Sequence, residues 1–88
     1  MVTVLVNHLN IRTEPGIHSR VVGQFNKGDR IYNYDALFFE CPYIWLRFYK
    51  GGKTRYVCKS IGTSYFDEYI KLSDSEFARL PQFGDGWD

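Results

Sequence analysis

Residues 43–58 read YIWLRFYKGGKTRYVC, and this stretch decides the fold class. Every second residue of its first half is apolar and is expected to face a core: Ile44, Leu46 and Phe48. Gly51–Gly52 marks a tight turn, after which residues 54–58 return as a second strand. The stretch predicts a β-hairpin that buries one face and turns Trp45, on the alternate face, outward.

The same hairpin fixes the relation between the two cysteines, Cys41 and Cys58. With the glycine pair at the tip, Cys58 lies opposite Trp45, and Cys41 is out of register with it. The offset is roughly 13 Å along a strand, whereas the Cα atoms of a disulfide lie about 7 Å apart at most. We therefore predict two free, buried thiols.

Similar segments recur on the N-terminal side of the hairpin. Further strands are predicted at residues 2–6, 9–12, 20–25 and 30–34. The segment 35–42 is apolar but irregular and is predicted as a loop. Short strands separated by turns at this spacing are typical of a small all-β barrel or sandwich.

The C-terminal part has a different pattern. Ser73 and Glu76 form a capping box, which predicts a short helix that runs through Leu80 and ends before Pro81. Residues 82–88 show no periodicity and are predicted as a loose end.

The composition favours a contact surface rich in aromatic side chains and gives no indication of binding to a charged polymer or to a membrane. The chain has 88 residues, enough for one small core, and its net charge of +1 creates no strong field. Tyr, Phe and Trp make up 18% of the sequence. A narrow barrel cannot enclose so many rings, so we expect several on the surface as contacts.

Five short motifs, in order, carry a resemblance to a known family. They are LNIRTEPG at 9–16, VVG at 21–23, KGD at 27–29, WLRF at 45–48 and GKTRYV at 52–57. Together they resemble the bacterial SH3-like (SH3b) domain family, over about residues 2–61. Glu14, Arg55 and the aromatic segment 34–45 depart from the family pattern.

The resemblance implies a small SH3-like barrel of five to seven short strands over residues 1–66. Residues 67–88 would then form a C-terminal extension with a short helix and a loose end. Members of the family are mostly non-catalytic modules that hold peptidoglycan hydrolases on the cell wall. Others occur in proteins with no role at the wall, so the family indicates the fold better than the ligand.

A ligand site is expected around the outward-facing aromatic and charged side chains. The candidate ligand-binding residues are Arg12, Glu14, Tyr34, Tyr43, Trp45, Arg47 and Tyr56. Two alternatives stay open. In one, Trp45 is a rim or core residue covered by the 35–42 segment; in the other, Arg12 only braces its turn.

Two functions follow as hypotheses. The first is a module that binds peptidoglycan or its stem peptides for a linked or co-expressed hydrolase, an endolysin or autolysin. The alternative is an intracellular or phage protein–protein interaction module. Self-association through Phe77, Leu80 or Trp87 would fit either. Nucleic-acid binding by the basic 47–59 hairpin is disfavoured, because five basic residues are few for that role.

Catalysis, metal binding and cofactors are not expected. His8 and His18 are the only histidines and have no recognised catalytic or metal-ligand spacing. The N-terminus does not resemble a signal peptide, and no apolar run reaches membrane length. We expect synthesis in the cytoplasm and action at the cell wall, within a longer protein or after lysis.

Overall fold

The computed structural model describes residues 1–62 and 68–84. The strands in this part of the chain are β1 (Val2–Val4), β2 (Leu9–Arg12), β3 (Val21–Phe25), β4 (Arg30–Ile31), β5 (Tyr34–Glu40), β6 (Tyr43–Lys50), β7 (Lys53–Ile61), β8 (Ile70–Lys71) and β9 (Gln82–Gly84). One helix, α1, spans Asp74–Arg79. The all-β prediction is confirmed, but the nine strands in the described residues exceed the predicted five to seven.

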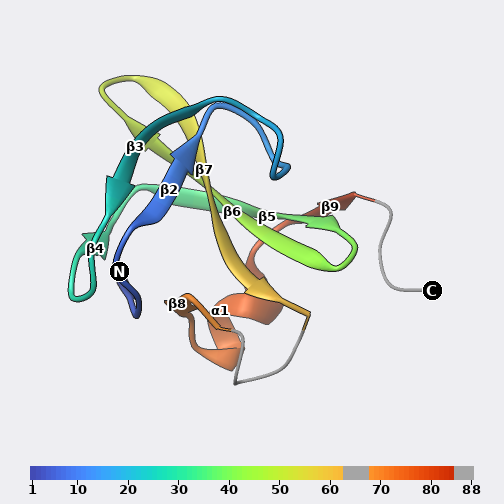
Figure 1. Cartoon of the computed structure of the whole chain (residues 1–88). Coiled ribbons are helices and arrows are strands. Elements are labelled where there is room, and N and C mark those ends of the chain that lie inside the picture. Colours follow the sequence, from blue (N-terminus) through green and yellow to red (C-terminus); the bar gives the residue numbers. More distant parts are fainter. Residues whose placement is uncertain (63–67, 85–88) are drawn as a thin grey trace.

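The strands pair into two sheets (Figure 1). The larger has the order β3-β2-β7-β6-β5-β9, and the smaller has the order β4-β1-β8. The described strands therefore do not close into a single hydrogen-bonded barrel.

The β6–β7 hairpin forms as predicted. Trp45 pairs with Cys58 as expected. A register shift between Ile44 and Trp45 separates this pair from the two pairs at the start of β6, Tyr43 with Ile61 and Ile44 with Ser60. Both cysteines are free, but only Cys58 is partly buried. Cys41 is exposed, contrary to the prediction, because it lies in the two-residue turn between β5 and β6.

The segment 35–42 is mostly a strand rather than the predicted loop. Residues 34–40 form β5, which pairs antiparallel with β6. Leu37 and Phe39 face the core, whereas Phe38 lies on the other face of the sheet. Large apolar side chains on both faces hide the alternation that identifies a half-buried strand.

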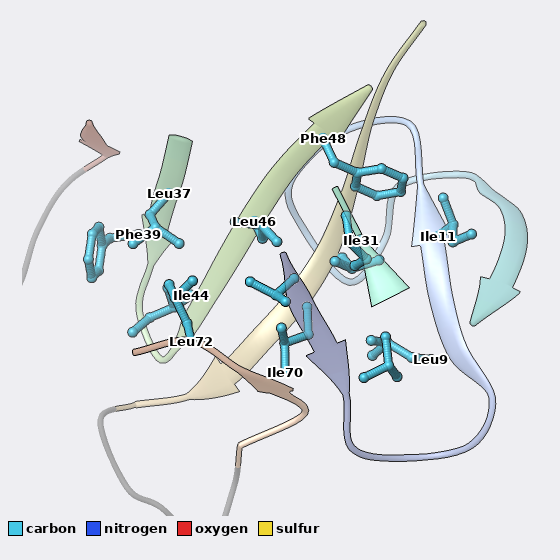
Figure 2. Packing of buried hydrophobic residues seen from close by; sticks show 13 residues of the cluster. Leu9, Ile11, Ile31, Leu37, Phe39, Ile44, Leu46, Phe48, Ile70 and Leu72 are labelled. Atoms are coloured by element: carbon cyan, nitrogen blue, oxygen red, sulfur yellow. The ribbon is translucent and has the colours of Figure 1, made fainter. Parts of the chain in front are cut away.

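The core lies between the facing sides of the two sheets, where their side chains point toward one another (Figure 2). Its buried members are Val2, Val4, Leu9, Ile11, Ile31, Leu37, Phe39, Ile44, Leu46, Phe48, Val57, Ile70 and Leu72. The three apolar residues predicted to face inward from the hairpin all belong to it. Residues 70 and 72 come from the predicted C-terminal extension, which therefore contributes to this core.

The predicted helix is present, and Ser73 is its N-cap, because the Ser73 hydroxyl oxygen accepts a hydrogen bond from the Glu76 amide at 3.2 Å. Phe77 and Leu80 are partly buried and pack against the core of their own chain. Trp87, the third residue named for self-association, lies outside the described residues.

The predicted loose end is partly ordered. Residues 82–84 form β9, which pairs in parallel with β5. Gly84 has a φ of 108°, and a Cβ there would overlap the carbonyl oxygen of Phe39. Only glycine therefore permits this approach of β9 to β5.

Candidate functional site

Trp45 lies on the face of the larger sheet that points away from the core, as predicted, yet it is buried. It is absent from the core cluster and is only 1% exposed, so the prediction of an exposed ring is wrong. The Tyr43 ring packs beside Trp45, and Ile17 of the β2–β3 connection, residues 13–20, lines a groove next to it. A Cβ at Gly16 would lie 3.4 Å from the Glu40 carboxylate, which places this connection beside the end of β5.

A groove of about 350 Å³ lies beside Trp45 and is called the Trp45 groove below. The residues that matter for its chemistry are His8, Asn10, Arg12, Tyr43, Trp45 and Ile61. Three predicted site residues, at positions 12, 43 and 45, thus meet at one place. The sequence analysis missed the other three, although the two-residue spacing of Asn10 and Arg12 on β2 places their side chains on one face.

The rings form the apolar part of the groove. The Tyr43 and Trp45 centroids lie 6.0 Å apart with an interplanar angle of 49°, and Tyr43 is half-buried. The indole Nε1 of Trp45 is buried and has no hydrogen-bond acceptor among the described residues. A buried donor without a partner is rare, because its desolvation is not compensated.

Polar groups line the opposite wall. Arg12 donates one guanidinium N–H to the carbonyl oxygen of Ser19 at 2.7 Å, so its remaining donors can face a ligand. The Asn10 side-chain oxygen accepts a hydrogen bond from Gln24 at 3.0 Å. His8 has a φ of 59°, a backbone conformation that is uncommon outside glycine and that recurs at ligand sites.

Cys58 also lines the Trp45 groove, but its chemistry is that of a neutral thiol. Burial raises its pKa to about 11, against a weaker opposing effect of a backbone hydrogen bond to Ser60 and of nearby Arg12. The thiolate is the nucleophilic form of cysteine, and at neutral pH it is scarce here. The groove is therefore suited to binding rather than to thiol chemistry.

Tyr34 lies away from the Trp45 groove, contrary to the predicted grouping. Its hydroxyl donates to the Glu76 carboxylate and accepts a hydrogen bond from the Met1 amino group at 2.8 Å. The side chain thus ties β5 to α1 and to the start of the chain.

Arg47 is occupied by neighbours on its own sheet. Its guanidinium makes two hydrogen bonds to Asp35, at 2.8 and 3.0 Å, and lies 5.3 Å from the ring centroid of Phe38. This pairing holds the pKa of Asp35 below its usual range. Arg47 therefore braces the β5–β6 pair and does not line the groove.

The last two predicted residues flank the Trp45 groove without lining it. Tyr56 pairs with Arg12 across β2 and β7, is half-buried, and meets the Phe38 ring edge-on at 5.4 Å. Glu14 is exposed in the β2–β3 connection, where its carbonyl oxygen accepts a hydrogen bond from the Ser19 hydroxyl at 2.7 Å.

The Tyr34–Glu76 bond predicts an alkaline limit to stability. Burial, together with the Glu76 bond, raises the pKa of Tyr34 to about 12. Because this folded-state pKa exceeds the ordinary value of about 10, the contribution is complete below about pH 10 and is lost between roughly pH 10 and 12. Tyr34→Phe is expected to cost about 1 kcal/mol at pH 8 and to flatten that alkaline decline.

Urea unfolding followed by circular dichroism at several pH values between 8 and 11.5 measures this effect. Tyr32→Phe, at a ring that is 65% exposed, is the matched control and should leave the curve unchanged. Tyr49, whose pKa is raised by its hydrogen bond to Asp35, leaves a residual slope in both variants. An equal alkaline decline in the wild type and in Tyr34→Phe would contradict the assignment.

No protein-family model, curated protein or solved structure matches this chain. Within residues 1–62 and 68–84, no three His, Cys, Asp or Glu side chains gather closely enough to hold a metal ion. The helix in the same part of the chain is too short to cross a membrane.

Proposed function

We propose that this chain is a non-catalytic binding module with an SH3-like fold that holds a peptidoglycan hydrolase on the bacterial cell wall. The hydrolase would be linked to the module or expressed with it, as an endolysin or autolysin. The observation that carries the proposal is the Trp45 groove, where Arg12, Tyr43 and Trp45 come together. Two sheets packed around one core support the SH3-like arrangement.

The groove offers groups that suit a wall stem peptide. Such a peptide carries small apolar side chains, amide groups and carboxylates. The Tyr43 ring and Ile61 offer apolar contact, and the free donors of Arg12 attract a carboxylate.

Arg12→Gln is expected to weaken wall binding about tenfold. Glutamine removes the charge but keeps an N–H donor for the Ser19 carbonyl oxygen, so the β2–β3 connection stays in place. A charge-assisted hydrogen bond contributes roughly 1.5–3 kcal/mol, which corresponds to a tenfold or larger change in dissociation constant. Sedimentation of the purified chain with isolated Gram-positive walls, at increasing wall concentration, gives the dissociation constant.

The matched control is Arg79→Gln, which makes the same chemical change on the exposed face of α1. It should sediment as the wild type does. Equal binding by Arg12→Gln and Arg79→Gln would exclude the Trp45 groove as the wall site. Failure of the wild type to sediment with any wall preparation would exclude the wall as the ligand.

A protein–protein interaction module is the second candidate, favoured by the edges of the larger sheet. The exposed apolar side chains Val21 and Val22 lie on β3 at one edge, and Phe83 lies on β9 at the other. Exposed strand edges with apolar side chains are sites at which another chain adds a strand. Absence of wall binding in the sedimentation experiment would favour this function.

A further inference from the structure

A second groove, of about 210 Å³, lies between the β4 region and the end of the β6–β7 hairpin. It is called the hairpin-tip groove and is defined by Phe25, Arg30, Tyr32, Phe48, Tyr49 and Lys50. It shares no lining residue with the Trp45 groove. The wall-binding proposal therefore makes no use of it.

Cations surround the hairpin-tip groove. Arg30 and Lys50 line it, and the β6–β7 register places Lys53 opposite Lys50 and Arg55 opposite Phe48. Directly opposite residues on paired strands lie on one face and about 5 Å apart. Within the described residues, none of the four cations is in an ion pair.

No acidic side chain lines this groove. Asp35 is paired with Arg47, whereas Asp29 keeps its negative charge, since it only accepts a hydrogen bond from the Asn26 amide at 2.7 Å. The four cations outnumber this one unpaired carboxylate, so the surroundings of the groove are positive despite a net charge of only +1.

Aromatic rings at the same groove are exposed to solvent. Tyr32 is 65% exposed and Tyr49 is 40% exposed. The Lys50 ammonium lies 5.8 Å from the ring centroid of Phe25, which also lines the groove, so a cation and an aromatic ring meet there. The Tyr49 hydroxyl instead donates a hydrogen bond to Asp35. Sites for single-stranded nucleic acid combine aromatic rings, on which the bases stack, with cations that contact the phosphates. The hairpin-tip groove has both.

We propose that the hairpin-tip groove binds single-stranded nucleic acid. A base stacks on Tyr32, and the phosphates on either side contact Lys50 and Lys53. An acidic peptide would satisfy the cations but would leave the exposed Tyr32 ring without a flat partner, so this ring favours the oligonucleotide. From the sequence alone, nucleic-acid binding by the 47–59 hairpin is disfavoured because its basic residues are few. The fold adds Arg30 and Tyr32, which lie far from the hairpin along the chain, to the same groove.

Fluorescence anisotropy with a labelled 15-residue oligothymidylate tests the proposal at 20 to 200 mM salt. Tyr32→Ala should weaken binding about tenfold at every salt concentration, since it removes one stacked base. The double change Lys50→Gln and Lys53→Gln should weaken binding and reduce the slope of log K against log salt by roughly 1.4. Arg79→Gln, at an exposed arginine of α1, should bind as the wild type does.

The outcomes that would overturn the proposal are distinct. They are absence of oligothymidylate binding by the wild type at 20 mM salt, equal binding by the wild type and Tyr32→Ala, or equal displacement of the label by polyglutamate. Sedimentation with walls keeps this test separate from the proposed function. Tyr32→Ala should sediment normally with walls, whereas Arg12→Gln should bind oligothymidylate normally.

Discussion

Replacing Trp45 by alanine is expected to lower the free energy of unfolding by about 3–5 kcal/mol. The side chain is 1% exposed and packs beside Tyr43 on the outer face of the sheet. Alanine would leave a cavity beside Tyr43 that the surrounding side chains close only in part. Domains of this size are stable by about 5–15 kcal/mol in total, so the loss is a large share.

Urea unfolding monitored by circular dichroism measures this loss. Trp45→Phe is the informative companion, because it keeps a large ring and removes the indole N–H that lacks an acceptor. Trp45→Phe should lower the free energy of unfolding much less than Trp45→Ala does, because removing a donor that lacks an acceptor offsets part of the stability lost with the smaller ring. A cost below 1 kcal/mol for Trp45→Ala would show that the ring is not buried in solution. Since Trp45→Ala disturbs folding, it is unsuitable as a binding variant, and Arg12→Gln serves that purpose.

Ile70→Ala is expected to cost about 2–4 kcal/mol, the second largest effect. Ile70 is fully buried on β8, where it pairs with Val4 and belongs to the core shared by both sheets. The expected cost combines lost apolar burial with a cavity between the sheets.

Lys71→Ala, one residue further along the same strand, is the control for Ile70→Ala. Lys71 is exposed and should tolerate the change within about 0.5 kcal/mol. Similar small costs for both variants would mean that the segment from residue 68 onward is separable from the core. A large cost confined to Ile70 would show that this segment folds with the rest of the chain.

The sequence predicts those parts of the fold in which one face of a strand is apolar. Ile44, Leu46 and Phe48 alternate cleanly, and the hairpin register follows from its glycine turn. Strand β5 was missed because Phe38 places a large ring on the face opposite Leu37 and Phe39. Strand β9 has only three residues, too few for an alternation of apolar and polar residues to be recognised. Its pairing depends on the close approach of Gly84 to the Phe39 backbone, which the sequence does not reveal.

The site was predictable to a similar extent. Period-two reasoning placed Arg12 and Trp45 on the same outer face, where they now share a groove. It did not reveal that Trp45 is buried, because alternation along a strand indicates the face on which a side chain lies but not what packs over that face. Tyr34 was misplaced because its partner, Glu76, lies on a helix that packs against the sheets from far along the chain.

The position of β1 between β4 and β8 has a consequence for the order of folding. Thr3 pairs with Lys71 and Val4 with Ile70, residues that are far apart along the sequence. A ribosome must therefore deliver residue 71 before β1 can gain its second neighbour. Contacts so distant along the chain slow folding, since the long intervening loop must close before they form. Among the described strand pairs, β1 and β8 have the largest sequence separation, so the smaller sheet is completed only late in synthesis.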